Sequence, residues 1–288
     1  SSGTTRRASL SSGGTQGNAE SIFCSVSGNG RFVAFASHAT NLVPNDGNGL
    51  QDVFVHDLQT GITTCASLDT GGATGNGHST YPSISFDGLF VAFVSRASNL
   101  VSGDTNGFWD AFIHDLQSGL TERVSITSSG LQANGQTEGS TSISADGRYA
   151  AFQSDASNLV AGDANGLPDI FIRDRITGTT ICGSVGSAGV QANDYSSNPS
   201  LSADGRYLVF TSGATNLVPQ DTNGVHDVFL RDIQLDQTQR ASVDSNGTQS
   251  NGTSSHDCAI SPNGRYVVFD SLGSNLVPGD TNATWDVF

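Results

Sequence analysis

The sequence predicts an all-β fold, a five-bladed β-propeller built from four-stranded antiparallel blades within a single domain spanning residues 1–288. The first observation behind this prediction is a repeat of nearly constant length, in which equivalent glycines follow one another at steps of 58, 59, 58 and 59 residues. These glycines are Gly30, Gly88, Gly147, Gly205 and Gly264. The second observation is that each repeat contains four short strand-like runs and follows its neighbour without a linker. Such a period, filled with strands, is typical of radially repeated blades.

The first repeat illustrates the four expected strands, at residues 21–27, 31–37, 52–57 and 62–68. Between the first two strands, Asn29 and Gly30 are typical of a two-residue hairpin, because that turn needs positive φ angles. The run Phe32–Phe35 is apolar on both faces, as a strand packed between two sheets requires. The other connections are longer and polar. We expect them to lie together on one face, called the long-loop face here, where functional residues gather.

The two ends of the sequence predict how the fifth blade is completed. Residues 4–10 are similar to the end of a repeat, such as residues 121–125, whereas residues 285–288 stop within a third strand. We therefore expect the N-terminal strand to close the last blade. The alternative is that this strand completes a blade of a neighbouring protomer, which would give a self-assembling structural protein, a homopolymer held by strand exchange.

Charge and composition limit the partners. A net charge of -15 and the absence of lysine argue against binding to nucleic acid or to an anionic membrane surface. No apolar run approaches the ~20 residues that insertion into a membrane requires. The richness in Gly, Ser, Thr and Asn is typical of secreted proteins, so we expect an extracellular or periplasmic location.

The four cysteines do not form the pattern of a disulfide framework. Cys24 and Cys258 share one repeat position, and Cys65 and Cys182 share another, at which the second repeat has Arg123. We expect free thiols at ordinary half-buried positions. A Cys24–Cys258 bridge is the one pairing that the repeat arrangement leaves open.

The loop between the second and third strands has the pattern Asp-x-Asn-Gly-x-x-Asp and is the candidate metal site. Calcium takes about six to eight oxygen ligands, which such loops can offer at alternating positions. The fifth loop has Ala283 in place of glycine, and we expect it to bind most weakly. The alternative is that the Asp and Asn side chains only cap turns. The predicted calcium ligands are Asp46, Asn48, Asp52, Asp104, Asn106, Asp110, Asp163, Asn165, Asp169, Asp221, Asn223, Asp227, Asp280, Asn282 and Asp286.

Other asparagines and aspartates recur around these loops. We expect Asn41 and its equivalents to fix the entry of the loop through side-chain to backbone hydrogen bonds. Asn18 and its equivalents, in the connection to the next repeat, either lend a further oxygen to an ion or form a plain turn. Asp57 and its equivalents end the third strand, where we expect them to cap the following turn.

The sequence shows no catalytic constellation, so a non-enzymatic role is favoured. His56 and His114 are the only histidines that share a repeat position, and Arg173 replaces them in the third repeat, which predicts a surface ion pair. Neither a Gly-x-Ser-x-Gly elbow nor a His-Glu-x-x-His helix is present. Carboxylates from different blades could form a glycosidase-like pair, but the sequence singles none out. A carbohydrate-active enzyme therefore stays the alternative.

The two tryptophans, Trp109 and Trp285, share one repeat position beside the acidic loops. An exposed indole next to a calcium ion suits stacking on a sugar ring, because the indole has a large apolar face with a polar edge. The alternative is that both rings pack locally. We therefore expect a protein or glycan ligand on the long-loop face, with these residues in contact with it.

Two segments of the fourth repeat resemble the TolB-type propeller repeat, Ser202–Phe210 (Ser-x-Asp-Gly-Arg-Tyr-x-x-Phe) and Asp227–Asp232 (Asp-Val-Phe-x-x-Asp). The resemblance covers essentially the whole chain. It implies blades formed in chain order, in periplasmic or secreted proteins that serve as binding platforms or as accessory domains of enzymes. From these observations we expect a secreted, calcium-binding propeller that acts as a binding or surface-assembly module.

Overall fold

The computed structural model of the chain describes residues 3–44, 46–254 and 257–288. The strands form five antiparallel sheets, and no helix occurs in these described ranges. The predicted all-β fold with five blades is thus confirmed. The chain divides into two compact units, Ser1–Val124 and Ser125–Phe288.

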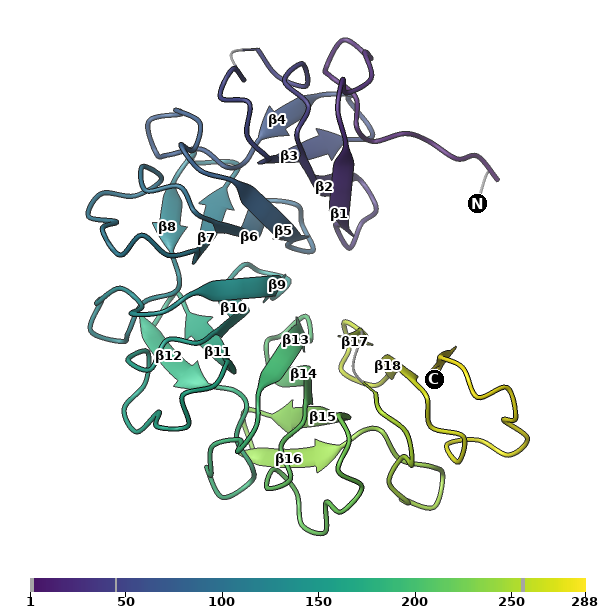
Figure 1. Cartoon of the computed structure of the whole chain (residues 1–288). Coiled ribbons are helices and arrows are strands. Elements are labelled where there is room, and N and C mark those ends of the chain that lie inside the picture. The colour runs from purple at the N-terminus through teal and green to yellow at the C-terminus, as the bar shows by residue number, and fades with distance from the viewer. Residues whose placement is uncertain (1–2, 45, 255–256) are drawn as a thin grey trace. The chain divides into compact units, whose positions relative to one another are not determined.

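The first unit contains two four-stranded sheets whose strands follow one another in chain order (Figure 1). The first sheet consists of β1 (Ser21–Val26), β2 (Phe32–Ser37), β3 (Asp52–Asp57) and β4 (Thr63–Cys65). The second sheet consists of β5 (Ser79–Ile84), β6 (Phe90–Ser95), β7 (Asp110–Asp115) and β8 (Thr121–Arg123).

The second unit contains two four-stranded sheets and one three-stranded sheet. The third blade is formed by β9 (Thr137–Ile143), β10 (Tyr149–Ser154), β11 (Asp169–Asp174) and β12 (Thr179–Cys182). The fourth is formed by β13 (Ser196–Leu201), β14 (Tyr207–Ser212), β15 (Asp227–Asp232) and β16 (Gln237–Arg240), and the fifth by β17 (Cys258–Ile260), β18 (Val267–Ser271) and β19 (Asp286–Val287).

The predicted closure of the fifth blade by the N-terminal strand stays a prediction. Residues 3–9 have no strand assignment, and the sheet of the fifth blade has three strands. In the first four blades the outer strand follows the third strand through a short turn, so the connection places the two strands side by side.

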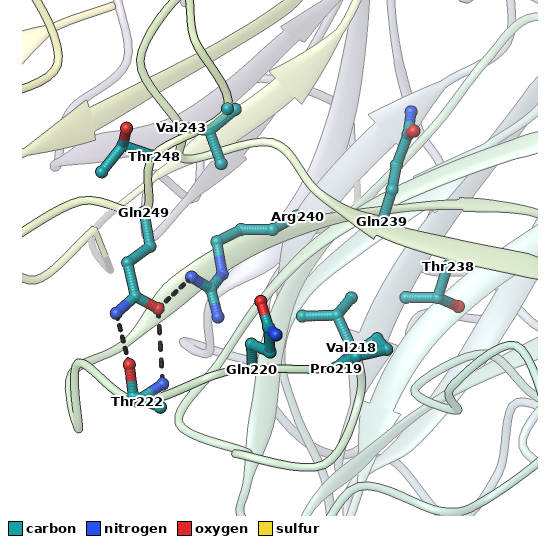
Figure 2. A pocket seen from close by; sticks show the side chains of 11 residues that line it. Val218, Pro219, Gln220, Thr222, Thr238, Gln239, Arg240, Val243, Thr248 and Gln249 are labelled. Atoms are coloured by element: carbon teal, nitrogen blue, oxygen red, sulfur yellow. Dashed lines mark hydrogen bonds between the residues drawn. The ribbon is translucent and has the colours of Figure 1, made fainter.

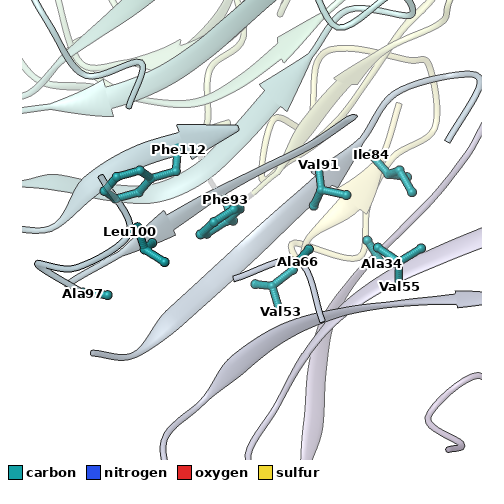
Figure 3. Packing of buried hydrophobic residues seen from close by; sticks show 10 residues of the cluster. All are labelled: Ala34, Val53, Val55, Ala66, Ile84, Val91, Phe93, Ala97, Leu100 and Phe112. Carbon is teal, nitrogen blue, oxygen red and sulfur yellow. The ribbon is translucent and has the colours of Figure 1, made fainter. Parts of the chain in front are cut away.

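The middle strands of each blade meet through one pair of stacked phenylalanines. Phe35 of β2 lies opposite Phe54 of β3 with ring centroids 5.9 Å apart, and the other four blades repeat this pair at 5.8–6.0 Å. Figure 3 shows the neighbouring apolar cluster, in which Val53 and Val55 of the first blade pack with Val91 and Phe93 of the second. These apolar side chains account for the continuous apolar runs of the second and third strands.

The turn between the first two strands of a blade is longer than predicted. In the third blade the Ser144 N–H donates to the Tyr149 carbonyl (2.9 Å), so four residues separate the paired ends instead of two. Within this turn only Gly147 has a positive φ, of 72°. Asp146 keeps an ordinary backbone angle because its Oδ1 accepts the Arg148 N–H (3.0 Å) and the Ser144 hydroxyl (2.7 Å). The side chain of Asp146 therefore closes the turn.

The predicted cap at the end of the third strand is confirmed and carries an additional ion pair. Asp57 Oδ1 accepts the Gln59 N–H at 2.8 Å, and Asp57 Oδ2 lies 2.6 Å from Arg31, whose guanidinium is 4.7 Å from the centre of the Phe32 ring. The hydrogen bond from Arg31 lowers the pKa of Asp57 below its usual range. The third and fourth blades repeat the ion pair, whereas the second blade has Leu89 in place of the arginine.

Candidate functional site

The long loop between the second and third strands contains the same hydrogen-bonded clasp in every repeat. In the first repeat, Asn48 Nδ2 donates to Asp52 Oδ2 (2.7 Å), while Asn48 Oδ1 accepts the Leu50 N–H (2.8 Å). Asn48 Nδ2 also donates to the carbonyl of Gly75, in the connection to the next repeat (3.1 Å). The clasp recurs at Asn106, Asn165, Asn223 and Asn282. Each asparagine oxygen is thus engaged in an Asx turn, which leaves the two aspartates of the pattern as the anionic pair.

A second pair of asparagines joins the long loop to the connection that precedes the blade. Asn41 Oδ1 accepts the Asn18 N–H at 2.9 Å, and Asn41 Nδ2 donates to the Gln16 carbonyl at 2.9 Å. Asn18 Oδ1 in turn accepts the Thr40 N–H at 2.9 Å. The predicted role of Asn41 at the loop entry is confirmed. The Asn18 oxygen is occupied by the backbone, as the plain-turn alternative requires.

The second aspartate of the pattern begins the third strand and is fully buried. Asp52 has no exposed surface, and its Oδ1 accepts the Ser67 hydroxyl at 2.6 Å. Ser184 and Ser242 hold Asp169 and Asp227 in the same way, both at 2.5 Å. Burial raises the pKa of Asp52 above its usual range, against the hydrogen bonds from Ser67 and Asn48.

In the second and fourth repeats, an arginine from the outer strand neutralises the two aspartates. Arg123 NH1 lies 3.1 Å from Asp104 Oδ1 and 3.2 Å from Asp110 Oδ2. Arg240 lies 2.9 Å from Asp221 and 3.4 Å from Asp227. The position follows from the strand register, because Arg123 pairs with Phe112, two residues after Asp110 on the same face of β7. All of these side chains are less than 10% exposed.

Figure 2 shows the surroundings of Arg240 in an open pocket of about 860 Å³. Arg240 NH1 donates to Gln249 Oε1 at 2.6 Å, and Gln249 Nε2 donates to the Thr222 hydroxyl at 2.7 Å. Gln249 lies in the connection to the next repeat, so one amide orients the arginine and ties it to the long loop. Val218, Pro219 and Val243 form the apolar part of the wall.

The third repeat uses an amide in place of the arginine. Cys182 takes the arginine position, and Gln191 Nε2 donates to both Asp163 Oδ1 and Asp169 Oδ2, each at 2.7 Å. Gln191 is the equivalent of Gln249, since they form isolated bridges to Val185 and Val243, which follow the outer strands of their repeats. The two carboxylates are therefore bridged by neutral donors.

The first repeat lacks both of these partners. Cys65 takes the arginine position and Thr74 the glutamine position. Asp46 is 7% exposed, and among the described residues no group donates a hydrogen bond to its buried Oδ1. Burial, and next the charge of Asp52, raise the pKa of Asp46 to about 6. The first repeat thus contains a buried carboxylate pair without the arginine or glutamine donor of the other repeats, and the charge of His78 acts to lower the pKa of Asp52.

The fifth repeat keeps the clasp on an exposed loop. Asn282 Nδ2 donates to Asp286 Oδ2 at 2.9 Å, and Asp280 lies in the same loop without an outer strand beside it. Ala283, which replaces the glycine of the pattern, has a φ of 55°, close to the 65° of Gly224. The alanine therefore adopts the backbone conformation that favours glycine elsewhere.

The two tryptophans occupy equivalent positions just before the third strand, and both are half-buried. At the same position the fourth repeat has His226, whose ring centre lies 4.7 Å from that of Tyr195. In the first repeat it is Gln51, whose backbone N–H donates to His78 Nδ1 at 3.0 Å. This position thus differs between repeats while the clasp beside it is constant.

The predicted surface ion pair is wrong at His56 and His114, because both rings are buried and contact the outer strand, whereas in the fourth repeat Arg231 at this position forms an ion pair with the exposed Asp236. His56 is 5% exposed with Nδ1 2.8 Å from the Thr63 hydroxyl, and His114 is 4% exposed with Nδ1 2.7 Å from the Thr121 hydroxyl. Arg173 donates to the equivalent Thr180 at 3.0 Å. All four cysteines have free thiols in the structure, and the predicted half-buried position holds for Cys182 and Cys258, whereas Cys65 is buried and Cys24 is exposed.

The sequence-based reasoning missed the partners of the carboxylate pairs. Arg123 and Arg240 share one repeat position with Cys65 and Cys182, and this alternation was visible in the sequence. Repeat spacing alone does not show that the outer strand points this side chain at the two aspartates, so the sequence indicates only an ordinary half-buried position.

Solved structures with the same fold include several propellers. TolB from Acinetobacter baumannii is 19% identical with a TM-score of 0.50, over 88% of this chain and 49% of that one. A candidate TolB from Agrobacterium tumefaciens is 18% identical with a TM-score of 0.52, over 88% of this chain and 70% of that one. The propeller domain of the Trilobed protease from Pyrococcus furiosus is 12% identical with a TM-score of 0.50, over 88% and 64%.

These similarities place the chain in the class of β-propellers. More narrowly, its fold is that of the TolB-type propellers, as the repeat motifs predicted. The chain spans about half the length of the Acinetobacter protein. No family model matches the sequence, and no curated protein matches it either.

Two further observations concern membranes and metals. In the described part of the chain, no helix is long and apolar enough to cross a membrane. Over the same residues, no group of three or more His, Cys, Asp or Glu side chains could hold a metal ion. An ion at a carboxylate pair would therefore need backbone carbonyls and water as its remaining ligands.

Proposed function

We propose that this chain is a secreted, calcium-binding β-propeller that serves as a non-enzymatic binding or surface-assembly module. The observation that carries the proposal is that Arg123 and Arg240 neutralise the carboxylate pairs of their repeats from buried positions. Two carboxylates in a desolvated site need a compensating positive charge. Where the chain supplies neither an arginine nor a bridging amide, a bound cation meets the same need.

Calcium is the cation that suits this chemistry and location. It accepts carboxylate, carbonyl and water oxygens in flexible geometry, and extracellular modules bind it with dissociation constants of about 10⁻⁴–10⁻³ M. A site with two carboxylates belongs at the weak end of that range. The composition supports secretion, because the chain has no lysine and is rich in Gly, Ser, Thr and Asn.

A binding role is favoured over catalysis by the way the buried titratable groups are used. Asp169 accepts hydrogen bonds from Ser184, Asn165 and Gln191, and His114 contacts Thr121. Groups occupied in this way stabilise the blades and are not presented to a substrate. The alternative of a carbohydrate-active enzyme would require carboxylates exposed at a shared cleft.

The ligand of this module is a protein or a glycan on the long-loop face. The support is that the residue at one repeat position differs between blades, being Trp109, His226 or Trp285, whereas the clasp beside this position is constant. A glycan array probed at millimolar calcium tests the glycan version, with Trp109→Ala as the variant and Trp109→Phe as the matched control. Binding that is lost in the first variant and kept in the second supports stacking on the ring, and no binding by the intact protein contradicts it.

The first test is thermal unfolding of EDTA-treated protein with and without millimolar calcium, using magnesium as the control. A ligand that binds only the folded state raises the melting temperature. We expect a calcium-specific rise. An unchanged melting temperature up to about 10 mM calcium, well above the expected dissociation constant, contradicts the calcium part of the proposal.

The alternative, self-assembly by strand exchange, has its own support. Arg7 donates a hydrogen bond to Gln16, as Arg240 does to Gln249, so this segment has the contacts of an outer strand and its connection. Yet residues 3–9 belong to no strand. In this alternative the segment pairs with β19 of a second copy. Light scattering at high protein concentration decides, because polymers support exchange and a sharp monomer peak contradicts it.

A further inference from the structure

We propose that the chain has one divalent-cation site, between Asp46 and Asp52 of the first repeat, and that the second, third and fourth repeats contain internal substitutes for the ion. This inference rests on the proposed calcium binding and assigns it to a particular place. The starting observation is a buried atom without a partner. Asp46 is only 7% exposed, and its Oδ1 accepts no hydrogen bond from a described residue.

The equivalent positions in the other repeats show what the first repeat lacks. The second repeat has an arginine nitrogen 3.1 and 3.2 Å from its two carboxylates, and the fourth has an arginine 2.9 and 3.4 Å away. The third has an amide nitrogen 2.7 Å from both. In the first repeat Cys65 and Thr74 replace the arginine and the glutamine together. The clasp by Asn48 still holds Asp52, whereas no donor replaces the arginine or glutamine at Asp46 Oδ1, and His78 acts as a positive neighbour of Asp52.

The donor atoms favour calcium over softer metals. Two carboxylates and nearby carbonyls are hard oxygen ligands. Cys65 is the nearest candidate for a soft ligand, but burial and next the charge of Asp52 raise the pKa of its thiol to about 12. A protonated thiol is a poor metal ligand, because the thiolate is the form that binds. Magnesium can also be held by one or two carboxylates when it keeps several of its waters, so magnesium is the control that distinguishes the two ions in the thermal unfolding test.

Calcium titration by isothermal calorimetry, supported by equilibrium dialysis, tests the site through its stoichiometry. We expect one ion per wild-type chain. The Asp46→Asn variant should bind none, and the Cys65→Arg/Thr74→Gln double variant should also bind none, because it installs the partners found in the fourth repeat. The Asp104→Asn variant is the matched control and should bind one ion, since its loop already contains Arg123.

A gain of function provides the converse test. The Arg123→Cys/Gln132→Thr double variant copies the first repeat into the second and should bind two ions. Binding of two or more ions by the wild type, or unchanged binding by Asp46→Asn, overturns this inference while leaving calcium binding itself in place. An absence of calcium binding by the wild type overturns the proposed function as well. The wild-type stoichiometry decides the question even if a double variant fails to fold, and circular dichroism confirms folding of the single variants.

Discussion

At the residue scale, the asparagine of each long loop explains why the repeated pattern fits both an ion site and a turn cap. Asn48 uses its oxygen to close an Asx turn on Leu50 and its nitrogen to hold Asp52. The same side chain therefore shapes the loop and fixes a carboxylate beside a second one. Turn capping is observed for the asparagines, and it does not exclude an ion at the carboxylates.

The residue after that asparagine gives a test of backbone strain. Gly224 has a φ of 65° with open space where a Cβ would lie, and Ala283 has the equivalent conformation at 55°. A non-glycine residue in this region costs about 1–2 kcal/mol, partly offset by the smaller entropy of the unfolded chain. We expect Gly224→Ala to destabilise the protein and Ala283→Gly to stabilise it, each by about 0.5–1 kcal/mol.

Urea unfolding measures both effects on the Gly224 and Ala283 variants. Gly49→Ala repeats the Gly224→Ala test at a second position, since Gly49 has a φ of 67° and equally open surroundings. A Gly224→Ala variant as stable as the wild type would show that the loop relaxes to another conformation and that the strain argument is wrong.

The candidate site could be predicted only in part at this scale. The recurrence of Asp46, Asn48 and Asp52 identified the loop, because those residues are adjacent in sequence and act locally. Cys65 and Thr74 could not be connected with the loop, because a strand pairing and an isolated bridge bring them there. Knowing which repeats have a counter-charge therefore required the register of the outer strand.

At the scale of elements, the four strands of each blade were predictable, and their turns less so. The third strand was predicted at residues 52–57 and is observed as Asp52–Asp57, because its apolar run is bounded by two aspartates. The hairpin at Ser144 is longer than the glycine pattern indicated, since Asp146 closes the turn with its side chain. The outer strand was predicted to extend to residue 68 but ends at Cys65. Beyond it Ser67 offers its hydroxyl, instead of its carbonyl, to the Val53 N–H.

The contact between the third and outer strands predicts a pH dependence. His114 is buried against Thr121, and burial lowers its pKa, with the charge of Asp115 acting in the opposite direction. A histidine in the unfolded chain has a pKa of about 6.5. As the pH falls below that value, the folded state therefore binds fewer protons than the unfolded state. The stability contributed by neutral His114 is complete above that pH and is lost as the pH falls below it.

The variant His114→Arg isolates this contribution, because Arg173 makes the equivalent contact in the third blade at 3.0 Å. We expect the free energy of unfolding to fall less between pH 7.5 and pH 5 in the variant than in the wild type. Chemical denaturation at each pH gives the difference, in which the contributions of the aspartates cancel. Equal pH dependence of the two proteins would contradict a role for the buried imidazole.

At the scale of the whole molecule, the distribution of arginine explains how a chain with a net charge of -15 is organised. Arg31, Arg148 and Arg206 neutralise the aspartates that end the third strands, while Arg123 and Arg240 neutralise two of the loop pairs. These arginines thus form ion pairs with particular aspartates inside the repeats. The repeats share one backbone plan but differ in charge at the long loops, and in our proposal that difference determines where an external cation binds.

This difference between repeats predicts where calcium stabilises the molecule, and hydrogen–deuterium exchange measured by mass spectrometry can locate it. We expect calcium to slow exchange in peptides covering residues 46–52 and 74–78, because an ion between Asp46 and Asp52 would hold the loop against the connection that Asn48 contacts through Gly75. Peptides covering residues 104–110 and 221–227 should exchange at unchanged rates, since an arginine already forms ion pairs with the aspartates of those loops. Equal protection of all the long loops would mean that calcium binds whether or not an arginine is present, and the internal arginines would then have no part in selecting the site.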